Sequence, residues 1–181
     1  LDRGRERLAA QKNLVPIVRA RLLGSLARVY RNLGAYPVAL ELLNEATPLM
    51  AEERDARLHA EWLRDLGSVL ELQGASAKAR DALHASLAAF EQLDGPSALS
   101  TARAAKLLAV TLQSLGDREA SGRMFQRADR DLNALASASV DNRADSALRL
   151  GSWFWVAGDF ASTTTYYARA LALRRREQPP N

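Results

Sequence analysis

Apolar and small residues occupy the same places in four successive segments of this chain. Each segment carries large apolar residues three or four positions apart, which is the period of one face of an α-helix. Small residues stand between them, where two helices have to approach closely. A glycine then interrupts each segment, and a second helical stretch follows. The pattern predicts antiparallel helix pairs and no β-sheet, because period-two alternation is absent.

The interrupting glycines are Gly34, Gly74, Gly116 and Gly158, at intervals of 40, 42 and 42 residues. Each falls where a helix end needs a left-handed backbone, which glycine adopts at the lowest energy. Regular spacing on this scale indicates a helical repeat array. Such arrays present extended binding surfaces, so the pattern favours binding over catalysis.

The segments agree place by place when they are aligned on these glycines. The first reads Leu23, Leu26-Ala27, Tyr30, Gly34, Tyr36, Ala39, Leu43 and Ala46. The second reads Leu63, Leu66-Gly67, Leu70, Gly74, Ser76, Ala79, Leu83 and Ser86. The third reads Ala105, Leu108-Ala109, Leu112, Gly116, Arg118, Ser121, Phe125 and Ala128. The fourth reads Ala147, Leu150-Gly151, Phe154, Gly158, Phe160, Thr163, Tyr167 and Ala170.

This pattern resembles the tetratricopeptide repeat (TPR), a helix-turn-helix unit of about 34 residues with W-x2-L-G-x2-Y followed by A-x3-F. The resemblance covers roughly residues 20–176. The proline that normally closes the unit is absent, and the period is longer. Both features are similar to the long repeats of kinesin light chains and many bacterial signalling proteins. The resemblance implies an all-α, right-handed α-solenoid of antiparallel helix pairs, with about eight or nine helices.

A weaker resemblance lies at the two ends. Residues 1–8 and 170–176 resemble the repeat region that follows the kinase domain in bacterial serine/threonine protein kinases. The sequence itself has no glycine-rich loop, HRD or DFG motif, so phosphotransfer would belong to another part of a longer protein. The chain begins with Leu1 and not with Met, which suggests a fragment of such a protein.

Helical stretches and breaks predict the organisation along the chain. Residues 1–13 form a remnant or capping helix, and residues 177–181 a disordered tail. Four TPR-like repeats occupy residues 15–176, at about 15–52, 55–94, 97–136 and 141–176. Pro48 falls late in a second helix, which it is expected to end near Thr47 or to kink there.

Composition excludes several kinds of site. The 181 residues contain no cysteine, which removes disulfides, thiolate zinc sites and cysteine nucleophiles. His59 and His84 are isolated, and no HExxH, G-x-S-x-G, P-loop or Rossmann motif is present. We therefore expect no catalytic residue, no cofactor and no metal.

The net charge of +4 is spread over all the predicted helices. Nucleic-acid binding would need a concentrated basic stripe with aromatic residues, so the spread argues against it. No apolar run is long enough to cross a bilayer and no signal peptide is present, so we expect no membrane contact. A cytoplasmic location fits the absence of cysteine.

The resemblance implies that the first helix of each pair lines a concave inner groove. The stripe on these helices holds seven basic and three acidic residues, Glu61, Glu71 and Asp145, for a charge of +4. Such a groove suits an extended peptide with acidic residues or a free carboxylate. The alternative is a solvated helix face that binds nothing. The candidate partner-binding residues are Arg21, Arg28, Arg31, Asn32, Arg64, Arg103, Lys106, Arg149 and Trp155.

The ligand-gripping residues of the best-known relatives do not stand at their places. The carboxylate clamp of chaperone-binding members would need a lysine where Gly24 stands and an asparagine where Asp65 stands. Kinesin light chains carry an asparagine in each first helix, at places held here by Ser25, Asp65, Leu107 and Arg149. The resemblance therefore implies an architecture and leaves the ligand open.

Aromatic residues gather near the C-terminus in Trp153, Phe154 and Trp155, with Tyr166 and Tyr167 in the last helix. Phe154 is the packing residue, and both tryptophans cannot be buried with it on one helix face. Either the last pair docks on another copy or domain, or Trp155 anchors a ligand in the groove. Simple packing of the terminal helices explains the cluster equally well.

These features lead to one main hypothesis and two alternatives. The main hypothesis is a non-catalytic TPR protein–protein interaction module of a larger bacterial signalling protein, which binds a peptide or partner domain in its groove. The weaker resemblance implies a link to a serine/threonine kinase. The first alternative is homo-oligomerisation, as a homodimer through the terminal repeat. The second is a ligand-sensing or partner-sensing domain of a bacterial transcription regulator.

Overall fold

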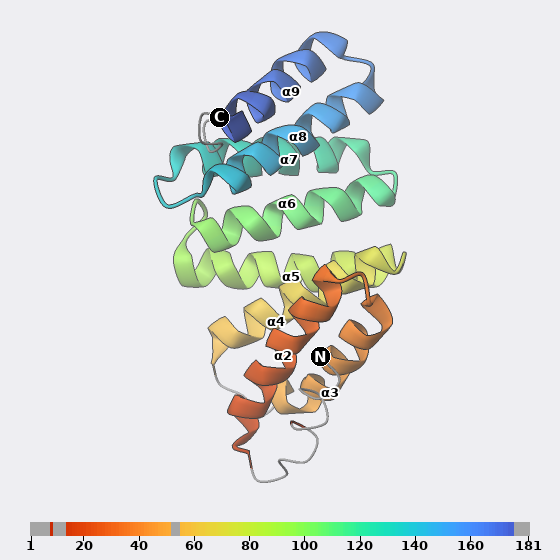
Figure 1. Cartoon of the computed structure of the whole chain (residues 1–181), viewed down its shortest axis with the longest axis vertical. Coiled ribbons are helices and arrows are strands. Elements are labelled where there is room, and N and C mark those ends of the chain that lie inside the picture. The colour runs from red at the N-terminus through yellow and green to blue at the C-terminus, as the bar shows by residue number, and fades with distance from the viewer. Residues whose placement is uncertain (1–7, 9–13, 52–54, 176–181) are drawn as a thin grey trace. The chain divides into compact units, whose positions relative to one another are not determined.

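A computed structural model describes Leu8, residues 14–51 and residues 55–175 (Figure 1). The helix predicted for residues 1–13, apart from Leu8, and the tail predicted for 177–181 lie outside these residues. The described part of the chain forms eight α-helices and no strand. The helices are α2 (Pro16–Asn32), α3 (Tyr36–Ala51), α4 (Ala56–Leu72), α5 (Ser76–Asp94), α6 (Leu99–Ser114), α7 (Arg118–Ala134), α8 (Val140–Ala157) and α9 (Phe160–Arg175).

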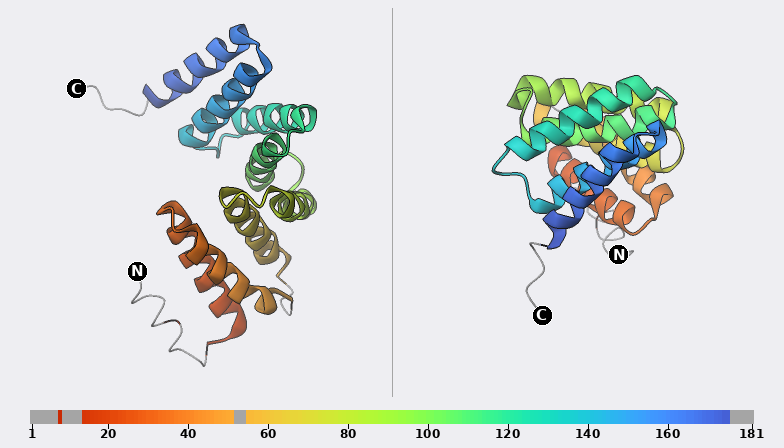
Figure 2. Two further views of the ribbon diagram at one scale, coloured as in Figure 1. Left: turned by 90° about the vertical axis from the view of Figure 1, so that its right-hand side faces the viewer. Right: turned by 90° about the horizontal axis from the view of Figure 1, so that it is seen from above.

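The chain divides into two compact units, residues 1–89 and residues 90–181, with the boundary inside α5. Unit 1 contains α2, α3, α4 and most of α5, and unit 2 contains the rest of α5 and α6 to α9. Within unit 1 α2 lies beside α3, and within unit 2 α8 lies beside α9 (Figures 1 and 2). Helix pairs are therefore the building element of both units, and the division into four repeats stays a prediction.

All four pairs turn through the same backbone geometry. Gly34, Gly74, Gly116 and Gly158 have φ between 78° and 83°, the left-handed region that favours glycine. In each turn the N–H of the residue after the glycine donates to the carbonyl four residues before the glycine, as in Ala35 to Tyr30 at 2.9 Å. This is the Schellman arrangement, which satisfies the last carbonyls of a helix. The equal turns impose equal entry angles on the second helices.

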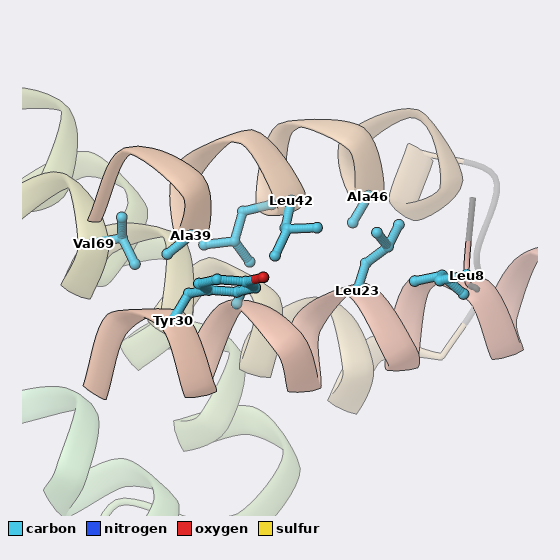
Figure 3. Packing of buried hydrophobic residues seen from close by; sticks show 9 residues of the cluster. Leu8, Leu23, Tyr30, Ala39, Leu42, Ala46 and Val69 are labelled. Atoms are coloured by element: carbon cyan, nitrogen blue, oxygen red, sulfur yellow. The ribbon is translucent and has the colours of Figure 1, made fainter. Parts of the chain in front are cut away.

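The core of unit 1 lies between α2, α3 and α4 (Figure 3). Large side chains from one helix meet small ones from another. Among the described residues, Leu8 belongs to the same cluster. Elsewhere in unit 1, the buried Ser86 hydroxyl of α5 donates to the carbonyl of Ala60 in α4 at 2.8 Å. The labelled members of the cluster are Leu8, Leu23, Tyr30, Ala39, Leu42, Ala46 and Val69.

Unit 2 combines buried alanines with close contacts between glycines and aromatic side chains. Phe125 of α7 and Leu150 of α8 are buried together with Ala109 of α6. Gly122 lies under the indole of Trp153, where a Cβ would collide with the ring. Close approach of α7 and α8 at this point therefore requires the missing side chain.

The expectation that Pro48 ends its helix is wrong, because α3 continues through Pro48 to Ala51. A proline removes one backbone donor and crowds the preceding turn. Continuation buries Met50, which is 4% exposed, so packing outweighs the local penalty. In the middle of α3, the carbonyl of Leu43 accepts from the Thr47 hydroxyl at 3.1 Å and from Trp62 Nε1 at 3.3 Å.

The close approach of α4 and α5 at Gly67 predicts that a methyl group added there lowers the stability of the fold. A Cβ at Gly67 would lie 2.5 Å from Cγ of Leu83 and 3.2 Å from the carbonyl oxygen of Ala79. Gly67→Ala is therefore expected to lower stability by about 1–3 kcal/mol through overpacking. The matched control is Gly24→Ala, whose new Cβ meets nothing nearer than Arg28 at 3.9 Å.

The control should raise stability by about 0.5–1 kcal/mol, since alanine is the better residue inside a helix. Thermal unfolding followed by circular dichroism measures both changes. Equal shifts of Tm in the two variants would contradict the packing account.

Candidate partner-binding faces

Three arginines of unit 1 converge on one buried carboxylate. Asp65 of α4 has a side chain only 5% exposed, and Arg28 of α2 reaches it at 3.0 Å. Arg64 lies 3.1 Å from the same side chain, and Arg31 lies 3.9 Å from it. The four residues together carry a formal charge of +2. The structure thus brings together three of the predicted binding residues around an anion that neutralises part of their charge.

Arg21 is tied to the start of the next first helix. Its guanidinium lies 2.9 Å from Asp55, which caps α4 by accepting from the backbone N–H of Leu58 at 3.0 Å. The hydrogen bond from Leu58 lowers the pKa of Asp55, and Arg21 lowers it further, against a smaller rise from burial. Asn32 accepts from Arg31 at 3.2 Å near the other end of α2. The predicted residues of α2 therefore form a row of contacts along this helix.

A pocket of about 210 Å³ opens between these helices in unit 1. Its apolar lining comes from Ala20, Met50, Leu58 and the ring of Trp62, and its volume is below the 300–1,000 Å³ typical of small-ligand sites. A pocket of this size suits one side chain of a bound segment. Its charged lining comes from Arg21, Arg28, Glu61 and Asp65.

Unit 2 repeats the cross-helix ion pair. Lys106 of α6 contacts Asp145 of α8 at 2.5 Å, and Arg149 reaches the same carboxylate at 3.3 Å. Burial raises the pKa of Asp145, but the charge and hydrogen bond of Lys106, with help from Arg149, outweigh it and the pKa is lowered. Arg103 is exposed, and the described part of the chain offers it no ion-pair or hydrogen-bond partner. Arg103 is thus the least constrained cation of the predicted set.

The two ion pairs share one geometric relation. Arg28 and Asp65 are 37 residues apart, and Lys106 and Asp145 are 39 apart. Both separations are three residues shorter than the local repeat of 40 or 42. Neighbouring first helices are therefore staggered by the same amount in each unit. Each cation faces an acid on the next first helix that lies three residues, or about one turn, before the residue equivalent to the cation in the next repeat.

Trp155 lies apart from these charged contacts. Its ring packs edge-on against Phe160 at 5.1 Å, and each of the two side chains is 59% exposed. Trp153 instead lies over Gly122, with Nε1 donating to the carbonyl of Arg118 at 3.3 Å. The two tryptophans therefore lie in different environments, as expected for residues two positions apart on one helix.

Sequence reasoning places Glu61 on the groove stripe, but it misses the central role of Asp65 and the place of Trp62 in the pocket lining. The sequence pattern marks Asp65 only as a departure from a clamp asparagine. The separation of 37 residues from Arg28 was the available signal, because it is one turn short of the repeat. Within the described residues, no group of three or more His, Cys, Asp or Glu side chains could hold a metal ion. None of the described helices is long and apolar enough to span a membrane.

A sequence profile of the tetratricopeptide repeat matches residues 18–83 and, in an overlapping second match, residues 58–128. These matches cover more than half of the chain. The chain belongs to the tetratricopeptide repeat family. Tetratricopeptide repeats are protein–protein interaction modules, so a protein or peptide is the class of partner that this TPR chain binds.

Solved structures confirm the all-α TPR-like solenoid class and the likeness to kinesin light chains. BtubC (BKLC) from P. vanneervenii is 22% identical, with a TM-score of 0.81 over 98% of this chain and 74% of that one. A putative kinesin light chain with TPR-like repeats from Podosopora anserina is 17% identical, with a TM-score of 0.74 over 89% and 77%.

A Rap protein complexed with Competence and Sporulation Factor is 13% identical, with a TM-score of 0.81 over 94% of this chain and 47% of that one. At these identities the likeness concerns the fold alone. None of the curated proteins compared with the TPR chain matches it significantly.

Removal of the shared carboxylate should destabilise unit 1. Asp65→Asn leaves Arg28, Arg31 and Arg64 close together without their anion. Loss of a fully buried partner typically costs about 3–5 kcal/mol, and the side chains of these arginines are 20–42% exposed, so we expect about 2–3 kcal/mol. Urea unfolding measures the change.

Asp81→Asn is the matched control, because the Asp81 side chain is 70% exposed and pairs with Arg80 on the surface. It should change stability by less than about 1 kcal/mol. An equal loss in the two variants would rule out a special role for the buried carboxylate.

The lowered pKa of Asp145 predicts acid sensitivity in unit 2. A carboxyl whose folded pKa is depressed stabilises the fold fully above its unfolded pKa of about 4, and this contribution is lost as pH falls through the folded value. Asp145→Asn should therefore lose less stability than the unchanged chain between about pH 5 and pH 2. Urea midpoints across this range test the difference, and parallel curves for the two proteins would refute it.

Proposed function

We propose that this TPR chain is a non-catalytic module of a larger bacterial signalling protein, and that it binds an extended peptide or partner domain on its first helices. The observation that carries the proposal is the set of arginines held beside the pocket of unit 1. Asp65 fixes Arg28, Arg31 and Arg64 before any partner arrives. Side chains that are already ordered lose less entropy on binding.

The chemistry of this face suits a partner with carboxylates. A guanidinium has five N–H donors, and the contacts with Asp65 occupy only some of them. The remaining donors can pair with a carboxylate in two-pronged geometry. The negative charges of Glu61 and Asp65 equal the positive charges of Arg21 and Arg28 in the pocket lining, so the pocket itself favours an apolar side chain. The arginines around the pocket favour acidic residues next to that side chain in the bound segment.

Peptide binding by this fold has a precedent among the compared structures. The Rap protein was solved in complex with Competence and Sporulation Factor. That precedent supports partner binding by the present chain without naming its ligand. An acidic partner, a link to a serine/threonine kinase and a cytoplasmic location remain predictions. A role as a sensing domain of a transcription regulator is the competing proposal, which the domains joined to this chain would decide.

Charge changes on the first helices should weaken partner binding. Arg28→Gln in unit 1 and Arg103→Glu in unit 2 are each expected to reduce affinity about tenfold, equal to about 1.4 kcal/mol, since each removes charge-assisted hydrogen bonds. An array of acidic peptides, with free and amidated C-termini, supplies the probes. Binding to wild type should also fall as salt rises, because exposed charges are screened.

Arg80→Glu and Arg123→Glu are the matched controls, because both arginines lie exposed on second helices. They should leave peptide binding unchanged. If Arg28→Gln and Arg103→Glu also leave binding unchanged, the first-helix faces do not bind the peptide and the proposal is wrong.

A further inference from the structure

Unit 2 contains a largely buried lysine at a place where unit 1 has a glycine. Gly24 of α2 and Lys106 of α6 hold the same position of the repeat, ten residues before the turn glycines Gly34 and Gly116. The Lys106 side chain is only 13% exposed, and its ammonium contacts Asp145 of α8. A Cβ on Gly24 would meet no atom nearer than 3.9 Å. The space that a lysine side chain fills in unit 2 is therefore open in unit 1.

The acid that receives this lysine also has an equivalent in unit 1. Glu61 of α4 and Asp145 of α8 both stand thirteen residues before their turn glycines. Gly24 therefore has the same relation to Glu61 as Lys106 has to Asp145. Within the part of the chain that the structure describes, Glu61 is half-buried and has no ion-pair or hydrogen-bond partner. Unit 1 thus keeps the acid of this pair and lacks its cation.

The pocket of unit 1 lies at this open place, since Gly24 and Glu61 both line it. The other charged residues of the lining already take part in ion pairs, which are Arg21 with Asp55 and Arg28 with Asp65. The lining is neutral in sum, but its one unpaired charge among the described residues is the negative charge of Glu61. A purely apolar side chain would leave Glu61 unpaired, whereas a long side chain with a cationic end would also pair with it.

The walls of the pocket suit the aliphatic part of a lysine. The methylene stem of this side chain packs against apolar surface while its ammonium reaches a polar partner. Ala20 and Met50 hold the places of Ala102 and Leu132 in unit 2, and both of those residues are completely buried there. A volume of about 210 Å³ leaves room for one such side chain. The apolar residues of the lining are Ala20, Met50, Leu58 and Trp62.

We propose that the pocket of unit 1 binds a lysine side chain of the partner, with its stem on the apolar wall and its ammonium paired with Glu61. The chain itself supplies the template for this contact, because Lys106 makes it with Asp145 in unit 2. Nearby arginines do not prevent it, since Arg149 contacts the same carboxylate as Lys106. The place of Arg149 is held in unit 1 by an acid, Asp65, so the pocket is the less positive of the two surroundings.

The lysine pocket rests on the proposed binding of a peptide and narrows the class of that partner. Acidic residues of a bound segment pair with the arginines around Asp65, and a single lysine enters the pocket beside them. A segment with one lysine among acidic residues therefore matches both surfaces. A segment of acidic residues alone matches only the arginines.

Gly24→Lys tests the geometry without any ligand, because it gives unit 1 the side chain that unit 2 has. The new ammonium should pair with Glu61, so adding Glu61→Gln to this variant should lower its Tm by about 2–4 °C. Gly24→Met is the matched background, since its side chain has a similar stem and no charge. Glu61→Gln should change the Tm of that variant by less than about 1 °C. Equal changes in the two backgrounds would overturn the proposal.

Peptide binding tests the ligand itself. The probes are short acidic peptides in which one position at a time is lysine or norleucine, followed by fluorescence anisotropy. At the position that enters the pocket, lysine should bind wild type about tenfold more tightly than norleucine, which has a similar stem without the charge. Glu61→Gln should reduce this ratio to about one, and so should Gly24→Lys, which fills the pocket. Glu119→Gln is the control that keeps the ratio, because the Glu119 side chain is 86% exposed on a second helix.

The possible failures point to different causes. Peptides that bind with no preference for lysine at any position would overturn the lysine pocket and leave the proposed peptide binding intact. A preference for lysine that survives Glu61→Gln would place the lysine elsewhere and would overturn the lysine pocket as well. Absence of binding by every peptide would overturn the proposed function together with its lysine pocket.

Discussion

Close approach of paired helices is the constraint on which the rest of this structure depends. Gly67 contacts Leu83, and Gly151 contacts Tyr167, at distances that leave no room for a Cβ. Such an approach holds only if the second helix returns at a fixed angle, which the left-handed glycine turns provide. Within each unit, the Arg28–Asp65 and Lys106–Asp145 ion pairs also show the same stagger between neighbouring first helices.

That stagger decides how charge is arranged on the first helices. A cation on one helix faces an acid on the next, so neither the buried Asp65 nor the part-buried Asp145 is left without a partner. Surface ion pairs add little stability, whereas breaking a buried one is expensive. The ion pairs with Asp65 therefore stabilise the fold and also fix the positions of the arginine side chains. Arginines that are already ordered lose less entropy when they bind an external carboxylate. Structural and binding roles of these residues do not exclude one another.

Local features of the chain were predictable from sequence because they depend on neighbours a few residues apart. The helical period, the glycine turns and the pairing of helices all belong to this class, and the TPR fold follows from them. Three results did not follow. Helix α3 passes Pro48 because Met50 is buried beyond it, Asp65 collects arginines from two helices, and Trp155 packs on Phe160. Each of these depends on how one helix packs against another, which cannot be predicted from the hydrophobic period of a single helix.

Helix α2 shows why one repeat can support two different kinds of contact. Leu23 and Tyr30 point to the core, Arg28 points to α4, and Leu22 lies on a third, exposed side. In the interior of a repeat array a first helix uses all three sides, since the preceding second helix covers the third. In α2 the equivalent side carries the apolar residues Leu22 and Val29, which are each 41% exposed. Core packing and the charged contacts between first helices therefore come from one repeated sequence pattern.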